Sequence, residues 1–138
     1  MTAGYSGKPL VDKLGIKSGM RIALVDVPPE FDLGPIPPGV TVGKGRGELD
    51  LVMFFVKQRA RLEKRWGALT GSLTPAGAMW VVWPKKAAAK AFGIATDMTE
   101  DVVREVVLPT GWVDTKVCAV DDTWSGLKCV LRVELRQR

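Results

Sequence analysis

The sequence predicts a single α/β domain spanning residues 1–138, with a mostly parallel central sheet covered on both faces to give three layers. Segments 21–27, 49–56 and 77–86 are apolar on both faces, as in buried strands of parallel sheets. Helix-patterned segments alternate with these strands, which is the order of strand–helix–strand units. Two alternating segments close the chain, so we expect an antiparallel hairpin at the C-terminal end.

The predicted elements follow from apolar spacing and from the glycines and prolines that end them. Strands are expected at residues 21–27, 40–42, 49–56, 77–86, 113–120 and 127–135, and helices at residues 8–14, 57–69 and about 100–108. The first helix has Leu10 and Leu14 on one face and stops at Gly15. Pro28 and Pro29 end the first strand, because proline cannot continue a ladder.

The middle of the chain combines an irregular segment with a basic helix. Residues 28–47 are rich in proline and glycine, and loops of this length in compact domains are often functional or mobile. In the helix at 57–69, Leu62, Trp66 and Leu69 recur at helical spacing. Its other face carries basic side chains beside a single acidic one, Glu63; the basic residues are Lys57, Arg59, Arg61, Lys64 and Arg65.

The elements of the C-terminal half are predicted from local sequence signals as well. Residues 74–77 read as a turn into the strand at 77–86, and residues 85–93 as a short helix or a mobile loop. Asp97 or Thr99 caps the next helix, whose buried stripe is built from valines. The closing strands are joined by a connection at residues 121–126.

Composition narrows the possible chemistry. The chain of 138 residues is 46% hydrophobic and 25% charged, which is typical of a soluble globular domain. It has no histidine, which excludes Ser-His and Cys-His nucleophile systems and histidine metal ligands. Cys118 and Cys129 are too few for a cysteine-only zinc site, and we expect them to be reduced core residues.

Charge and hydropathy indicate a cytoplasmic protein. No apolar run approaches the roughly 20 residues that span a bilayer, and residues 1–8 lack the apolar core of a secretory signal. The net charge of +5 permits binding to anions or nucleic acid, but solubility charge is the favoured explanation.

Several stretches resemble class I methyltransferases, which have a Rossmann-like fold. The stretch 14–21 resembles the lead-in to their first strand, 48–52 their fourth strand, and 73–77 the turn before their fifth. In that family a glycine-rich loop after the first strand holds S-adenosylmethionine, whereas this chain has Pro28 and Pro29 there. Two prolines remove amide donors and prevent close backbone approach. The second and third strand units also look shortened or missing. We therefore expect the fold without the cofactor.

The whole chain also resembles a small bacterial family of uncharacterised proteins, a domain of unknown function. The resembling stretches are residues 50–55, 79–85, 96–104, 108–119 and 122–127, with Arg132. This resemblance implies no activity.

The most interesting side chains lie at the carboxyl ends of the predicted strands or just after them. If the strand order follows the resemblance, Asp26, Lys57, Trp83 and Lys85 emerge at one edge, where open α/β sheets bind ligands. Trp83 would stack on a planar ligand, Lys85 would bind an anionic group, and Asp26 or Asp122 would act as a base. The turn holding Asp122 and Trp124 lies either nearby or at the opposite end.

Each of these candidates has a structural explanation as well. Trp83 and Trp124 also suit core positions, Lys85 a solvated one, and Asp122 a turn cap, which is the favoured role for Asp122. The run Gly43-Lys44-Gly45-Arg46-Gly47 suggests a phosphate cradle, but no helix follows it, so a flexible surface loop is favoured. A solvated face is likewise favoured for the basic helix.

These observations leave three hypotheses. The first is a non-catalytic protein that binds a small anion or a protein partner on a reduced methyltransferase-like scaffold. The second is a degenerate S-adenosylmethionine-dependent enzyme with the Pro-rich segment as a lid. The third is weak nucleic-acid binding through the basic helix face. The sequence favours the first hypothesis. Under it we expect no catalytic residue, no bound metal and no membrane attachment.

Overall fold

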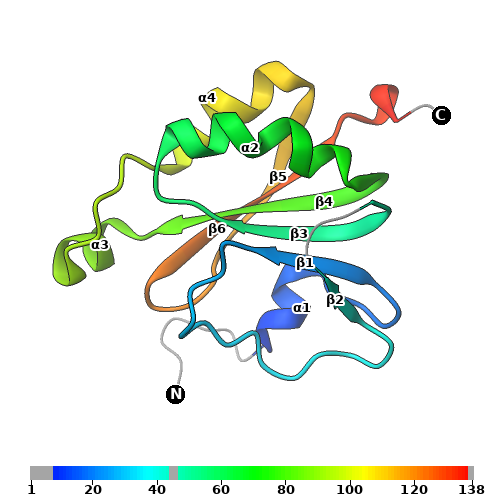
Figure 1. The fold of residues 1–138 in the computed structure, drawn as a ribbon, viewed down its shortest axis with the longest axis horizontal. Helices are drawn as coiled ribbons and strands as arrows, with labels where there is room; N and C mark the ends of the chain where they lie inside the picture. Colours follow the sequence, from blue (N-terminus) through cyan, green and yellow to red (C-terminus); the bar gives the residue numbers. More distant parts are fainter. Residues whose placement is uncertain (1–7, 44–46, 137–138) are drawn as a thin grey trace.

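The computed structural model describes residues 8–43 and 47–136, which form one layered α/β unit (Figure 1). In chain order its elements are α1 (Leu10–Leu14), β1 (Arg21–Val25), β2 (Thr41–Gly43), β3 (Leu49–Phe55), α2 (Arg59–Gly71), β4 (Leu73–Pro84), α3 (Lys86–Phe92), α4 (Glu100–Val107), the 3-10 turn η1 (Leu108–Thr110), β5 (Trp112–Ala119), β6 (Trp124–Leu131) and the 3-10 turn η2 (Val133–Leu135).

The six strands form one sheet in the order β2-β1-β3-β4-β6-β5. Strands β2, β1, β3 and β4 run parallel, whereas β6 is antiparallel to both of its neighbours. The predicted fold class is therefore confirmed: a single α/β domain with a mostly parallel sheet and a C-terminal antiparallel hairpin. The carboxyl ends of β1, β3 and β4 meet at one edge of the sheet, where open α/β sheets bind ligands.

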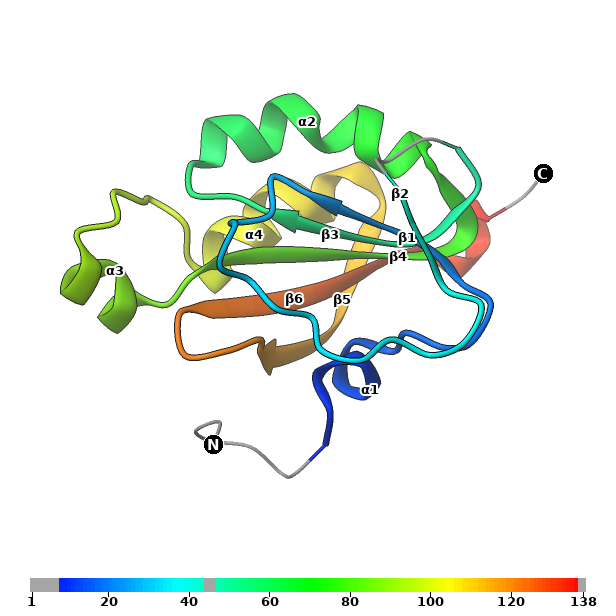
Figure 2. The same ribbon diagram turned by 60° about the horizontal axis from the view of Figure 1, so that its bottom comes forward.

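Two apolar cores hold the three layers together. On one face α2 and α4 cover the sheet, and on the other lie α1 and the segment after β1 (Figure 2). Leu62 and Trp66 of α2 and Val103 of α4 belong to the first core. The second core takes Phe31 and Leu33 from the Pro-rich segment, so part of that irregular segment serves as a packing layer.

Several element boundaries differ from those expected. The first strand ends at Val25, two residues before the predicted end, because Asp26 turns into the left-handed region at φ 55°. The stretch 74–77, predicted to be a turn, is part of β4 and is the place where the pairing register with β3 shifts. A side chain on Gly77 would lie 3.0 Å from Thr74 O, so glycine permits this kink inside a continuous strand.

The strand bounds of the hairpin also differ from those predicted. Strand β6 begins at Trp124 and ends at Leu131, so the connection is shorter than expected and residues 133–135 form a 3-10 turn. The Asp121 carboxylate accepts hydrogen bonds from the amides of Thr123 and Trp124, both at 2.8 Å, and closes the turn early. The alternation of apolar and polar residues continues beyond Leu131, so the sequence pattern predicts a strand that ends later than β6 does.

Helix boundaries moved by a few residues at most. The first helix starts at Leu10 rather than at residue 8, and α2 runs two residues later than predicted at both ends. Residues 86–92 form the short helix α3. Thr99 rather than Asp97 caps α4, its hydroxyl oxygen accepting a hydrogen bond from Val102 N at 3.1 Å. The described part of the chain has no helix long and apolar enough to cross a membrane.

Both cysteines are free and buried, as predicted. Cys129 lies fully buried on β6, and burial raises the pKa of its thiol from 9.0 to about 12. Cys118 is slightly more exposed; burial raises its pKa, and Lys13 and Lys116 oppose that rise.

The buried thiol of Cys129 predicts a stability loss at high pH. Between pH 9 and about 12 the unfolded thiol ionises while the folded one stays protonated, so the folded state binds more protons and stability falls as pH rises. Below pH 9 this group contributes no slope. We expect urea unfolding between pH 8 and 11 to show a shallower decline in Cys129→Ala, which keeps Cys118. Parallel declines in the two proteins would contradict this assignment.

Candidate functional site at the carboxyl ends of the strands

A pocket of about 690 Å³ opens at the carboxyl ends of β1 and β3, beside the β5–β6 turn. This volume lies within the range of small-molecule sites. Its walls come from the segment after β1, the β3–α2 junction, the end of α3 and the hairpin turn. The lining residues are Asp26, Pro28, Pro29, Glu30, Phe55, Val56, Lys57, Gln58, Arg61, Phe92, Ile94, Thr123 and Trp124.

An ion pair between Asp26, the residue after β1, and Arg61 of α2 forms part of one wall of the pocket. The Asp26 Oδ2 atom accepts hydrogen bonds from Arg61 Nε at 3.1 Å and Nη2 at 2.9 Å. The two side chains are 37% and 44% exposed, so the pair contributes little to stability. Within the described residues, Oδ1 of Asp26 accepts no hydrogen bond, so this oxygen is available to a ligand. Asp26 also holds a left-handed backbone, which aspartate tolerates better than most residues.

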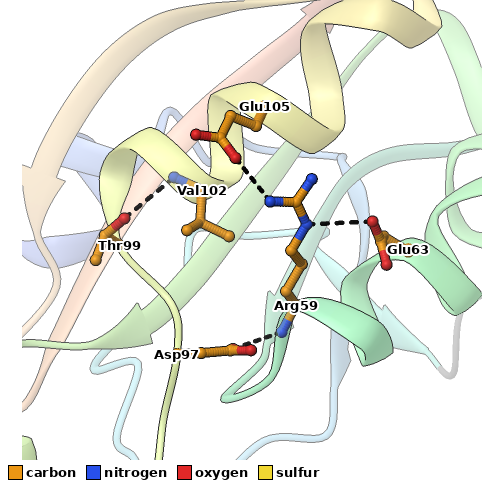
Figure 3. Close-up of polar contacts among 6 residues, drawn as sticks. All are labelled: Arg59, Glu63, Asp97, Thr99, Val102 and Glu105. Atoms are coloured by element: carbon orange, nitrogen blue, oxygen red, sulfur yellow. Dashed lines mark hydrogen bonds and ion pairs between the residues drawn. The ribbon is translucent and has the colours of Figure 1, made fainter.

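The start of α2 is held in place by an ionic clamp to α4. Figure 3 shows Arg59 between Glu63 and Glu105, with N···O distances of 3.2 Å and 2.6 Å. The Asp97 carboxylate accepts a hydrogen bond from Arg59 N at 2.7 Å and so caps the helix from a distant segment. Through this clamp α4 and its preceding loop hold the start of α2, which follows Lys57 and carries Arg61.

The floor of the pocket is aromatic. The Phe55 ring meets Phe31 at 4.9 Å between ring centroids and Trp124 at 5.2 Å, both in edge-to-face arrangements. Phe55 and Trp124 are only 3% and 4% exposed, so the floor is continuous with the core beneath the sheet. The pocket therefore combines apolar rings with charged side chains. The basic ones are Lys57 and Arg61, and the acidic ones are Asp26 and Glu30.

The structure brings together some of the residues singled out from the sequence and separates others. Asp26, Lys57 and Trp124 line the pocket. Trp83 is 6% exposed and packs in the core under α2 and α4, on the face of β4 that also carries Val81. The half-buried Lys85 and the exposed Asp122 lie outside the lining, and Lys85 N donates to Thr123 O at 2.7 Å.

Other lining residues were not singled out from the sequence. Arg61 was predicted only as part of a basic helix face, and Phe92 only fell within residues 85–93, expected to be a short helix or a mobile loop. In the helix predicted at 57–69, Arg61 lies one turn after Lys57 and therefore near the strand end, which was the signal for it. No local pattern predicted that Phe92 and Ile94 reach the pocket, because their position depends on the path of α3.

The basic face of α2 is partly neutralised. Its Arg59 and Arg61 are ion-paired with side chains of other elements, Glu105 and Asp26. Lys57 has no ion pair in the part of the chain that the structure describes. The predicted phosphate cradle has its Lys44 and Arg46 outside the described residues. No cluster of potential metal ligands occurs among residues 8–43 and 47–136.

The backbone after β1 differs from a glycine-rich cofactor loop. Pro28 and Pro29 carry no amide hydrogen, and Phe31 N donates to Pro28 O at 3.1 Å, so few donors remain. The first glycine after β1 is Gly34, and β2 is a three-residue edge strand. A ligand such as S-adenosylmethionine therefore cannot be held here by a backbone cradle. The aromatic side chains of the pocket suit the planar base of S-adenosylmethionine, and the charged side chains suit its amino-acid end.

Comparison with known proteins supports the same fold. No protein-family model and no curated protein sequence matches this chain. A SAM dependent methyltransferase from Aquifex aeolicus superimposes with a TM-score of 0.58 at 14% identity, covering 87% of this chain and 86% of that one. A putative type 11 methyltransferase from Sulfolobus solfataricus gives a TM-score of 0.58 at 12% identity, covering 94% and 93%. N-methyltransferase NodS from Bradyrhizobium japonicum WM9 gives 0.57 at 9% identity, covering 89% and 92%.

At these identities the likeness establishes the fold alone. This chain has a methyltransferase-like Rossmann fold, and the predicted resemblance to class I methyltransferases is confirmed at that level. The resemblance to a bacterial family of unknown function stays a prediction.

Proposed function

We propose that this chain is a degenerate methyltransferase-like protein that binds S-adenosylmethionine or its demethylated product in the strand-end pocket. The observation that carries the proposal is the pocket itself, which lies at the carboxyl ends of β1 and β3 and joins an aromatic floor to charges of both signs. The solved methyltransferases that share the fold support the choice of ligand.

The pocket side chains divide into groups that complement such a ligand. The free oxygen of Asp26 and the Glu30 carboxylate suit an ammonium group or hydroxyls, and the Lys57 ammonium suits a carboxylate. Phe55 and Trp124 supply the apolar floor on which a base would rest. When bound, S-adenosylmethionine would supply an electrophilic methyl group.

The proposal is tested by isothermal titration with S-adenosylmethionine and S-adenosylhomocysteine. We expect wild type to bind and Asp26→Asn to bind about tenfold more weakly, because the charged acceptor is replaced by a neutral amide oxygen. Asparagine also tolerates the left-handed backbone at this position, so the fold should persist. Asp122→Asn is the matched control, since Asp122 is exposed and lies outside the pocket.

Absence of heat with both ligands would overturn the proposal. Equal weakening in Asp26→Asn and Asp122→Asn would show that general charge, rather than the pocket, governs binding.

A second candidate is a non-catalytic protein that holds a different small ligand or a partner in the same pocket. It is favoured by Pro28 and Pro29, which remove backbone donors next to β1. A thermal-shift screen of small anions and amino acids, together with pull-down, addresses it. An unchanged melting temperature with every compound and no captured partner would weigh against this candidate.

A further inference from the structure

Phe92 is the one large apolar side chain of α3, and it is not used to attach that helix to the core. The rest of α3 consists of lysines and alanines, and Ala88 is its buried residue at 7% exposure. Phe92 is 71% exposed, yet it lines the strand-end pocket. An exposed phenylalanine leaves apolar area in water, and covering that area is favourable.

The position of Phe92 at the pocket is fixed at both ends of α3. At the start, Lys85 N donates to Thr123 O at 2.7 Å, which ties the helix to a residue that lines the pocket. At the end, Gly93 takes φ 66° and Ile94 N donates to Ala89 O at 2.9 Å, so the helix stops directly after Phe92. Figures 1 and 2 show α3 standing away from the sheet at this edge.

The part of the pocket formed by the core presents further rings. Phe55 and Trp124 form the floor, and the rings of Pro28 and Pro29 line another side. Aromatic side chains favour flat partners, which they contact face-on or by their edges. A flat ring in the pocket would therefore find aromatic side chains available from both the core and α3.

From these contacts we infer that the ligand of this pocket carries a flat unsaturated ring, and that Phe92 selects it by stacking. The inference rests on the strand-end pocket being the ligand site, as proposed above, but not on the ligand being S-adenosylmethionine. It assigns Phe92 a part in ligand selection and makes α3 the element that completes the site.

Titration with the fluorescent dye 8-anilinonaphthalene-1-sulfonate tests this inference on the whole chain. We expect wild type to bind the dye, Phe92→Ala to bind it roughly tenfold more weakly, and Phe92→Tyr to retain affinity, as stacking on an aromatic side chain predicts. Val133→Ala is the matched control, because Val133 is 73% exposed and lies outside the pocket. Melting temperatures should agree across the variants, since neither side chain is buried.

The outcomes separate the two proposals. If the dye does not bind, or if Phe92→Ala and Val133→Ala weaken it equally, the role of Phe92 is overturned. If dye binding depends on Phe92 while S-adenosylmethionine and its product give no heat, the inference stands and the proposed function fails.

Discussion

Replacing Trp80 with alanine is expected to lower the free energy of unfolding by about 3–5 kcal/mol, the range for a buried Trp→Ala change. Trp80 lies on β4 in the core beneath the sheet and is 0% exposed. Its indole Nε1 donates to Leu14 O at 2.9 Å, which ties the end of α1 to the central strand. Alanine would leave a cavity and an unpaired carbonyl, and urea unfolding followed by fluorescence would measure the loss.

Trp80→Phe separates these two effects. Phenylalanine fills most of the space but cannot donate, so we expect an intermediate loss of about 1–3 kcal/mol. A loss for Trp80→Ala no larger than that for Trp80→Phe would show that packing around this ring is looser than the structure indicates.

Valine at Gly126 is expected to destabilise the protein by about 1–3 kcal/mol through overpacking. Gly126 lies on β6 opposite Val82, and a Cβ atom there would come within 3.0 Å of Trp80 Cε3 and 3.1 Å of Val120 Cγ2. The branched side chain would push the Trp80 ring or the hairpin away from the sheet. The change would appear as a lower urea midpoint with an unchanged slope.

Gly67→Ala provides the matched control for this substitution. Gly67 lies in α2 and is exposed, and a methyl group added there would have no neighbouring side chain or distant backbone within 4 Å. Alanine has the higher helix propensity, so we expect a gain of about 0.5–1 kcal/mol. Similar losses at Gly67 and Gly126 would contradict the argument from close contacts.

The strands and helices were predictable because each depends on nearby residues. Apolar runs such as the one around Trp80 identify buried strands, and Gly15 and Pro28 end their elements by backbone conformation. The boundaries that were wrong depend on distant partners. Residues 74–77, predicted to be a turn, form a kink inside β4. They continue the strand because Leu49 of β3 pairs with Leu73 on one side of the kink and Leu51 pairs with Ala78 on the other.

The candidate site was predicted only in part. Asp26 and Lys57 lie near the carboxyl ends of predicted strands, so strand order alone places them at the carboxyl edge. Trp83 and Trp124 were indistinguishable in the sequence, since both are tryptophans next to strand ends. The structure buries Trp83 beneath α2 and α4 and sets Trp124 in the pocket floor.

The sequence by itself determined the fold class, the strand edge at which a site would lie, and the prolines that replace a glycine-rich loop. Tertiary structure alone decided which side chains gather there: Arg61 pairs with Asp26, and Phe92 lines the same pocket as Phe55 and Trp124. A strand that is apolar on both faces does not reveal which neighbour each face will meet. That choice depends on packing between segments far apart in the chain.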